Sequence, residues 1–116
     1  MLDKKGDELE LLVENVLNIG DDEFYRASRY SHPLTVVLLN CDDKKAFEYI
    51  EKHIRQTDII QQLSSDLLLL LLPHTNHENS ILLLDKLKEK IDFTYISREF
   101  KEPKEKFIEQ IFLDNL

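Results

Sequence analysis

Arg55 and Asp58 are the residues of this 116-residue chain whose types and spacing most clearly suit ligand binding. A guanidinium can make forked hydrogen bonds to a phosphate or to the edge of a guanine, and a carboxylate can accept from guanine N–H donors. A structural interpretation competes with this one, because arginine also stabilises the negative end of a helix and an aspartate can begin the next strand. Four-residue patterns recur by chance, so the sequence alone favours the structural interpretation.

The histidines suggest a second kind of chemistry. His74 and His77 lie three residues apart, with Glu78 adjacent, which raises the question of a metal site. The pattern has no clear third ligand, so we favour a solvated helix start. His32 and His53 stand alone in the sequence, and we expect both at the surface. The sequence predicts no metal site, no catalytic residue and no cofactor.

Residues 40–43 follow an apolar run and also carry reactive side chains. Asp42 and Asp43 are expected to cap a helix rather than to act as paired acids. Cys41 is expected to be a small core residue, because no base for a nucleophile is identifiable. As the single cysteine, it also excludes an internal disulfide and a cysteine-rich zinc site.

Composition excludes several classes of function. The net charge is −8, which argues against a nucleic-acid surface, because phosphate binding needs a basic face. The chain has two glycines, Gly6 and Gly20, and therefore no glycine-rich phosphate loop. Its first residues are charged, unlike a signal peptide, and no apolar run approaches the roughly 20 residues of a membrane span. We therefore expect a cytoplasmic protein without a membrane partner.

The spacing of apolar residues predicts the elements that position these side chains. Gly20 can end the first helix, Asp21 or Asp22 can cap the second, and Thr75 or Asn76 can start the fourth. Helices are predicted over residues 7–19, 22–31, 43–55, 75–90 and 102–113. Strands are predicted over 34–39 and 92–97, with a hairpin over 58–73 that turns at the polar residues 64–66.

The hairpin organises the predicted fold. Its second run, residues 67–72, consists of six leucines and has no polar face. Such a run, ended by Pro73, suits a strand at the centre of a sheet with both faces covered. The order of elements then predicts an α/β (α+β), ferredoxin-like fold: a four-stranded, mainly antiparallel sheet with two helices on one face. One or two helices precede it, and we divide the chain into an N-terminal helix, 1–20, and a domain, 21–116.

Three stretches of the chain together resemble the GGDEF (diguanylate cyclase) family. Residues 26–39 resemble the approach to its first strand, residues 55–75 resemble its signature hairpin with flanks, and residues 93–97 fit its next strand. The resemblance covers roughly residues 22–113 in order. It implies a GGDEF-like fold.

The signature hairpin is degenerate. Ser64 and Ser65 stand where the family has glycines that let the backbone approach nucleotide phosphates. Asp66 is retained, but Leu67 replaces the following acid and Leu68 replaces the aromatic residue. The resemblance therefore implies ancestry and fold, and argues against cyclase activity.

Two further differences point the same way. Asn40 aligns with the family's metal-binding aspartate, leaving Asp42 nearby, and Mg²⁺ prefers carboxylate oxygen together with substrate phosphates. The chain also lacks the segment that recognises guanine in the family, because one short helix after Lys45 leads directly to Arg55. This is a shortened domain, expected to be inactive as an enzyme.

The expected function is therefore a signalling or protein-interaction module. One alternative is a receptor for cyclic-di-GMP, because Arg55 and Asp58 keep the Arg-x-x-Asp spacing that the family uses as an inhibitory site. A residual nucleotide-processing enzyme is the other alternative. We expect the helix at 7–19 either to bind a protein partner or a second copy of the chain, or to fold back and cover an open face of the sheet.

Overall fold

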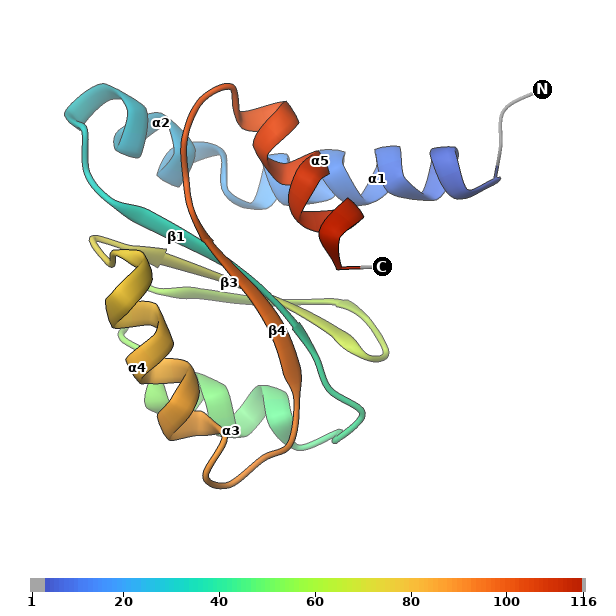
Figure 1. Cartoon of the computed structure of the whole chain (residues 1–116), viewed down its shortest axis with the longest axis vertical. Coiled ribbons are helices and arrows are strands. Elements are labelled where there is room, and N and C mark those ends of the chain that lie inside the picture. The colour runs from blue at the N-terminus through green and yellow to red at the C-terminus, as the bar shows by residue number, and fades with distance from the viewer. Residues whose placement is uncertain (1–3, 116) are drawn as a thin grey trace.

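The computed structural model describes residues 4–115 and contains the elements expected from the sequence in the expected order (Figure 1). The helices are α1 (Lys4–Ile19), α2 (Asp21–Tyr30), α3 (Ala46–His53), α4 (His77–Leu87) and α5 (Lys104–Asp114). The strands are β1 (Leu34–Asn40), β2 (Ile59–Ser64), β3 (Leu67–Pro73) and β4 (Thr94–Glu99).

The four strands form one antiparallel sheet in the order β2-β3-β1-β4. The central pair runs from Leu34 opposite Pro73 to Asn40 opposite Leu67. With α3 and α4 as the crossovers, this is the predicted ferredoxin-like arrangement. The leucine strand β3 is interior, as expected, because both of its edges are paired.

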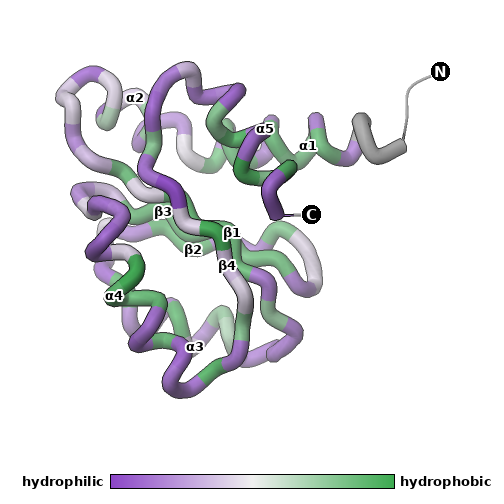
Figure 2. The backbone as a smooth tube through the Cα atoms, viewed as in Figure 1, coloured by the Kyte–Doolittle hydropathy of each residue, from purple (hydrophilic) through white to green (hydrophobic). Residues whose placement is uncertain are grey.

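Both faces of the sheet are covered by helices, which explains a strand without a polar side. Leu67, Leu69 and Leu71 point into a cluster with α1, α2 and α5, whereas Leu68, Leu70 and Leu72 point into a cluster with α3 and α4. The central leucines 69–71 have an exposed fraction of 0%. Figure 2 shows hydrophobic residues along the central strands of the sheet. At roughly 1.5–3 kcal/mol per fully buried leucine, this strand is a major source of stability.

Helix α1 covers one face of the sheet. Val13 and Val16 are buried against β-strand residues and against α5, while Leu11 is 65% exposed. Figure 1 shows α5 crossing α1, with the N-terminal turns of α1 extending past it. Of the two alternatives expected for this helix, the structure shows that it covers the sheet, and binding of a partner stays a prediction. None of the helices formed by residues 4–115 has the length and apolar composition that crossing a membrane requires.

The prediction of the last strand was wrong by two residues at each end, because β4 spans Thr94–Glu99 rather than 92–97. Phe93 is buried in the cluster with α3 and α4, and the carbonyl of Asp92 accepts a hydrogen bond from Cys41 Sγ at 3.3 Å. Pairing with β1 therefore starts at Thr94, opposite Asn40. Cys41 is buried, as predicted.

Helix boundaries differ from the predicted ones where local hydrogen bonds decide them. The cap of α2 is Gly20, without a side-chain hydrogen bond, so neither Asp21 nor Asp22 caps it. Asp43 accepts a hydrogen bond from the Lys45 backbone N–H at 2.8 Å in a turn that precedes α3. Asn76 caps α4 as expected, through its side-chain oxygen and the Asn79 N–H. Helix α4 ends at Leu87 rather than at residue 90.

Candidate functional site

Arg55 and Asp58 lie in the turn between α3 and β2, and they bind each other. Asp58 Oδ2 accepts from the Arg55 backbone N–H at 2.8 Å and from Nε at 3.2 Å, while Oδ1 accepts from Nη2 at 2.8 Å. The Asp58 N–H donates in return to the Arg55 carbonyl at 3.0 Å. The structure therefore brings together the two residues that the sequence singled out. They are hydrogen-bonding partners of each other.

The arginine also reaches a second segment. Its Nη2 donates to the carbonyl of Pro73 at 2.5 Å and to Thr75 Oγ1 at 2.8 Å, which ties the α3–β2 turn to the loop after β3. The Asp58 side chain is only 3% exposed, against 52% for Arg55. The hydrogen bonds that the Arg55 side chain donates to the Asp58 carboxylate raise the pKa of Arg55 further above its already high usual value. The guanidinium is therefore a permanent cation that neutralises a buried carboxylate.

A hollow of about 290 Å³ lies beside this pair. Its walls come from the end of α3, the start of α4 and the loop after β3, and they include His53, His74 and Asn79. The Nε and Nη2 atoms of Arg55, which form its fork, are hydrogen-bonded to the Asp58 carboxylate. A phosphate or a guanine could engage Arg55 in a forked manner only by displacing hydrogen bonds that the protein already makes.

The β2–β3 hairpin makes a tight turn without glycine. Ser65 and Asp66 form the turn, Ser64 Oγ donates to Asp66 Oδ1 at 3.0 Å, and Leu63 is an extra residue in β2 relative to β3. Among the described residues, the only non-glycine positive φ values occur at Ser31 and His74. The turn therefore needs no left-handed residue, which explains how serines can occupy it.

The two hairpin positions that follow the turn are part of the core. Leu67 and Leu68 are buried on opposite faces of the sheet, with exposed fractions of 9% and 2%. Neither side chain can offer a ligand to a nucleotide or a metal ion. Sequence reasoning identified the substitution, and the structure adds that both positions serve packing.

The end of β1 lies next to this turn. The Asn40 side-chain amide donates to Asn115 Oδ1 at 2.8 Å, so it is bound to the residue after α5. A hollow of about 570 Å³ beside it has four carboxylates in its lining, those of Asp42, Asp43, Asp66 and Asp92. Within residues 4–115, no three His, Cys, Asp or Glu side chains are grouped as metal ligands would be. The carboxylates are spread around the hollow instead of converging.

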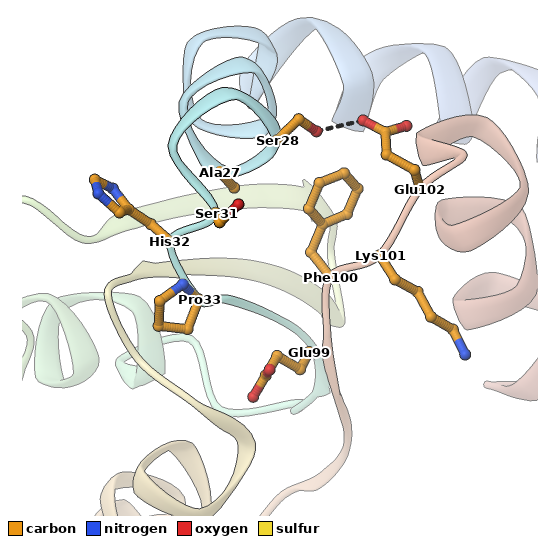
Figure 3. Close-up of a pocket in the computed structure, with 9 residues that line it drawn as sticks. All are labelled: Ala27, Ser28, Ser31, His32, Pro33, Glu99, Phe100, Lys101 and Glu102. Carbon is orange, nitrogen blue, oxygen red and sulfur yellow. Dashed lines mark hydrogen bonds between the residues drawn. The ribbon is translucent and has the colours of Figure 1, made fainter.

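Another hollow, of about 410 Å³, separates α2 from the segment that joins β4 to α5 (Figure 3). Figure 3 shows Phe100 pointing into this space and His32 turned away from it. Ser28 Oγ donates to Glu102 Oε1, and Glu102 Oε2 accepts from the Lys104 N–H at 3.1 Å. These bonds attach the start of α5 to α2, and the carboxylate beside the serine is also bound to the backbone at the start of α5.

One contact between reactive side chains was missed in the sequence. The rings of His32 and His74 have centroids 4.4 Å apart, although the residues are distant along the chain. A signal did exist, since the hairpin-like pairing of β1 with β3 places Leu34 opposite Pro73. Residues just before Leu34 and just after Pro73 must then be neighbours at the same end of the sheet.

Comparison with known proteins identifies the fold. No family model matches the chain, and no curated protein matches it. Among solved structures, the crystal structure of a DGC protein from Thermotoga maritima is similar over 87% of this chain and 88% of that chain. The TM-score is 0.62 and the sequence identity is 15%, so the similarity establishes a shared fold.

Proposed function

We propose that this chain is a catalytically inactive GGDEF-like module that acts in signalling by binding a protein. The observation that carries the proposal is the use of the hairpin. Leu67 and Leu68, at the positions where the resembled family has an acid and an aromatic residue, are buried in the core on opposite faces of the sheet. A fold shared with a DGC protein and a hairpin devoted to packing together favour binding over catalysis.

The remaining strand-end residues support this proposal. Phosphoryl transfer depends on metal ions that neutralise phosphate charge and on groups that position the nucleotide. Asn40 offers a neutral amide that is already bound to Asn115. Helix α3 ends at His53 and is followed directly by the Arg55 turn, which leaves no segment there to recognise a base.

A cyclic-di-GMP receptor is the second candidate, because Arg55 and Asp58 line a hollow of about 290 Å³. Binding there would require Arg55 to exchange Asp58, Pro73 and Thr75 for the ligand. Each charged hydrogen bond contributes about 1.5–3 kcal/mol, so this exchange weakens binding relative to an open arginine. The receptor therefore ranks below the protein-binding module, and a residual nucleotide-processing enzyme ranks below both.

The first test is enzymatic. Purified chain incubated with GTP and Mg²⁺ should yield no cyclic dinucleotide by liquid chromatography and mass spectrometry. Asp66→Ala is the matched control, because Asp66 is the one acid of the hairpin turn. Product that is formed by the wild type and lost in Asp66→Ala would overturn the proposed inactivity.

Calorimetry with cyclic-di-GMP separates the two binding candidates. If the chain is a receptor, cyclic-di-GMP should release or absorb heat on binding, and Arg55→Ala should lower the affinity by roughly tenfold to a hundredfold. The protein-binding module expects neither heat nor a shift in melting temperature at millimolar ligand. Thr57→Ala, an exposed position inside the same turn, is a suitable control for nonspecific effects.

A further inference from the structure

The four histidines of the chain gather at one end of the sheet. His32 precedes β1, His53 ends α3, His74 follows β3, and His77 begins α4. All four positions lie at the end where β1 starts and β3 finishes. His53 is occupied locally, since its ring contacts Tyr49 and its Nδ1 is 2.7 Å from the Tyr49 carbonyl oxygen.

His32 and His74 form a defined pair within this group. Their ring centroids are 4.4 Å apart with 45° between the planes, and Tyr30 stacks on the outer side of His32 at 5.7 Å. The His74 N–H donates to the Pro33 carbonyl at 2.7 Å, which joins the two loops directly. Ser31 and His74 have φ values of 54° and 57°, so both loops adopt left-handed backbone beside the pair.

We propose that His32 and His74 together bind a divalent d-block ion such as Zn²⁺, Ni²⁺ or Cu²⁺. Neutral imidazole nitrogen is a preferred ligand for these ions. With metal–nitrogen distances of about 2.0–2.1 Å, two imidazoles on one ion have ring centroids about 4.5 Å apart at an N–metal–N angle of about 90°, and about 5 Å apart at the tetrahedral angle of Zn²⁺. The two rings are in contact at 4.4 Å between centroids, which is close to the separation that a shared ion requires. Rotation of the exposed rings about their side-chain bonds then directs one nitrogen of each toward the ion.

The partner of His74 in this site is His32, and not the neighbouring His77 that the sequence pattern suggested. The ring of His74 contacts that of His32, whereas the backbone N–H of His77 donates to Glu99 Oε1 at 3.0 Å at the start of α4. Since the described residues place no third protein ligand with the pair, water completes the coordination. An open site of this kind favours exchangeable binding over a permanent structural metal.

The charges around the pair permit a cation. Glu23 and Arg26 of α2 face the same small hollow as His32 and His74, and they are paired with each other at 2.8 Å. Arg55, near His74, is neutralised by Asp58. Glu99 of β4 and Glu102 lie on the other side of His32, together with Lys101. Arg29 lies over the ring of Tyr30, at 5.8 Å from its centroid. With Arg26 and Arg55 paired and a net charge of −8, the protein attracts cations overall.

Binding should be measured on the full chain, free of any affinity tag and treated with a chelator. Addition of Ni²⁺ or Zn²⁺ should raise the melting temperature, because an ion held between two loops favours the folded state. Mg²⁺ should have no effect, since it prefers oxygen ligands. Removing a group that merely supports a metal ligand weakens binding 10- to 100-fold, so removing a ligand should cost at least roughly tenfold by calorimetry.

The matched variants are His32→Gln and His74→Asn, with His53→Gln and His77→Gln as controls. Asparagine is chosen at position 74 because it tolerates a positive φ, which keeps the loop intact. Circular dichroism and melting of each variant without metal confirm that it folds. Loss of binding in both pair variants, with binding retained in both controls, supports the site. Absence of binding in the wild type, binding unchanged in the pair variants, or equal losses in all four variants would overturn it.

Discussion

Arg55 joins segments that are far apart in the chain, and this role could not be predicted from its immediate neighbours. The spacing of Arg55 and Asp58 was visible, and so was the structural alternative of a helix-end arginine. The bonds to the Pro73 carbonyl and to Thr75 were not visible, because these partners become neighbours only after β2 pairs with β3. At this scale the sequence singled out both residues and favoured the structural interpretation, and ligand binding by the pair stays a prediction.

Arg55→Ala should lower the free energy of unfolding by about 1–3 kcal/mol, because it leaves the buried carboxylate of Asp58 without its charged partner. Arg55→Lys should lose less, since it keeps the charge but not the fork. The measurement is urea unfolding followed by circular dichroism. Arg29→Ala is the control, because Arg29 is exposed and contacts only the ring of Tyr30 among the interactions described.

The contribution of Arg55 to the free energy of unfolding should not change with pH in the neutral range. The pKa of Arg55 is raised in the folded state, so its stabilisation is fully present below the pKa of the unfolded chain and is lost only as pH rises through the higher pKa of the folded state. The difference between wild type and Arg55→Ala should therefore be constant from roughly pH 6 to 9. A difference that shrinks steadily across this range would contradict the assignment.

At the scale of elements, the junction of α1 and α2 depends on Gly20. Its φ of −100° is open to any residue, so backbone freedom does not explain the glycine. A Cβ atom there would lie 2.7 Å from Phe24 Cε2 and 2.9 Å from Leu71 Cδ1. Both neighbours are buried, and Phe24 also packs on Phe100 at 5.0 Å between ring centroids. The glycine therefore lets two helices meet directly over the leucine strand.

Gly20→Ala should destabilise the protein by about 1–3 kcal/mol, because Phe24 and Leu71 must move to admit the methyl group. Without this clash, alanine would stabilise the protein by about 0.4–1 kcal/mol, because it lowers the conformational entropy of the unfolded chain. A lower stability of Gly20→Ala in thermal or urea unfolding would therefore report the packing effect. Asn18→Ala, at an exposed position near the end of α1, should be close to neutral. Equal stabilities of wild type and Gly20→Ala would contradict the packing role.

The boundaries of elements were harder to predict than their existence. Residues 67–72 predicted a central buried strand, because six leucines ended by a proline fit few other positions in a soluble fold. The shift of β4 to Thr94–Glu99 depended on where Phe93 finds its core partners, which no local pattern records. The charged Arg98 and Glu99 could join that strand because it lies at the edge of the sheet.

At the scale of the whole molecule, α1 has two distinguishable faces. Val16 is 1% exposed within the core, whereas Leu11 is 65% exposed on the outside, near the acidic Glu10 and Glu14. Covering the sheet therefore depends on the inner residues, and any binding of a partner would have to use the outer ones. Sequence periodicity identified the apolar stripe but could not show which part of it the fold would use.

Leu11→Asp and Val16→Asp test these two roles separately. Val16→Asp should unfold the domain or lower its melting temperature strongly, because it buries an unpaired charge. Leu11→Asp should leave the stability within about 0.5 kcal/mol of wild type. If the chain self-associates through this helix, Leu11→Asp should dissociate the oligomer in analytical ultracentrifugation. A wild type that sediments as a monomer at every concentration would exclude the self-association form of the proposal.

The packing of the first helix on the last one also has a consequence during protein synthesis. Val16 belongs to the same cluster as Ile108 of α5, and α1 contacts α5 extensively. At about 5–20 residues per second, a ribosome needs roughly 5–20 s to pass from one to the other. The leucine strand is complete only at Pro73, so one of its faces lacks part of its cover during the last part of that interval, from Pro73 to Ile108. The nascent chain therefore exposes apolar surface of the kind that promotes aggregation until its final helix emerges.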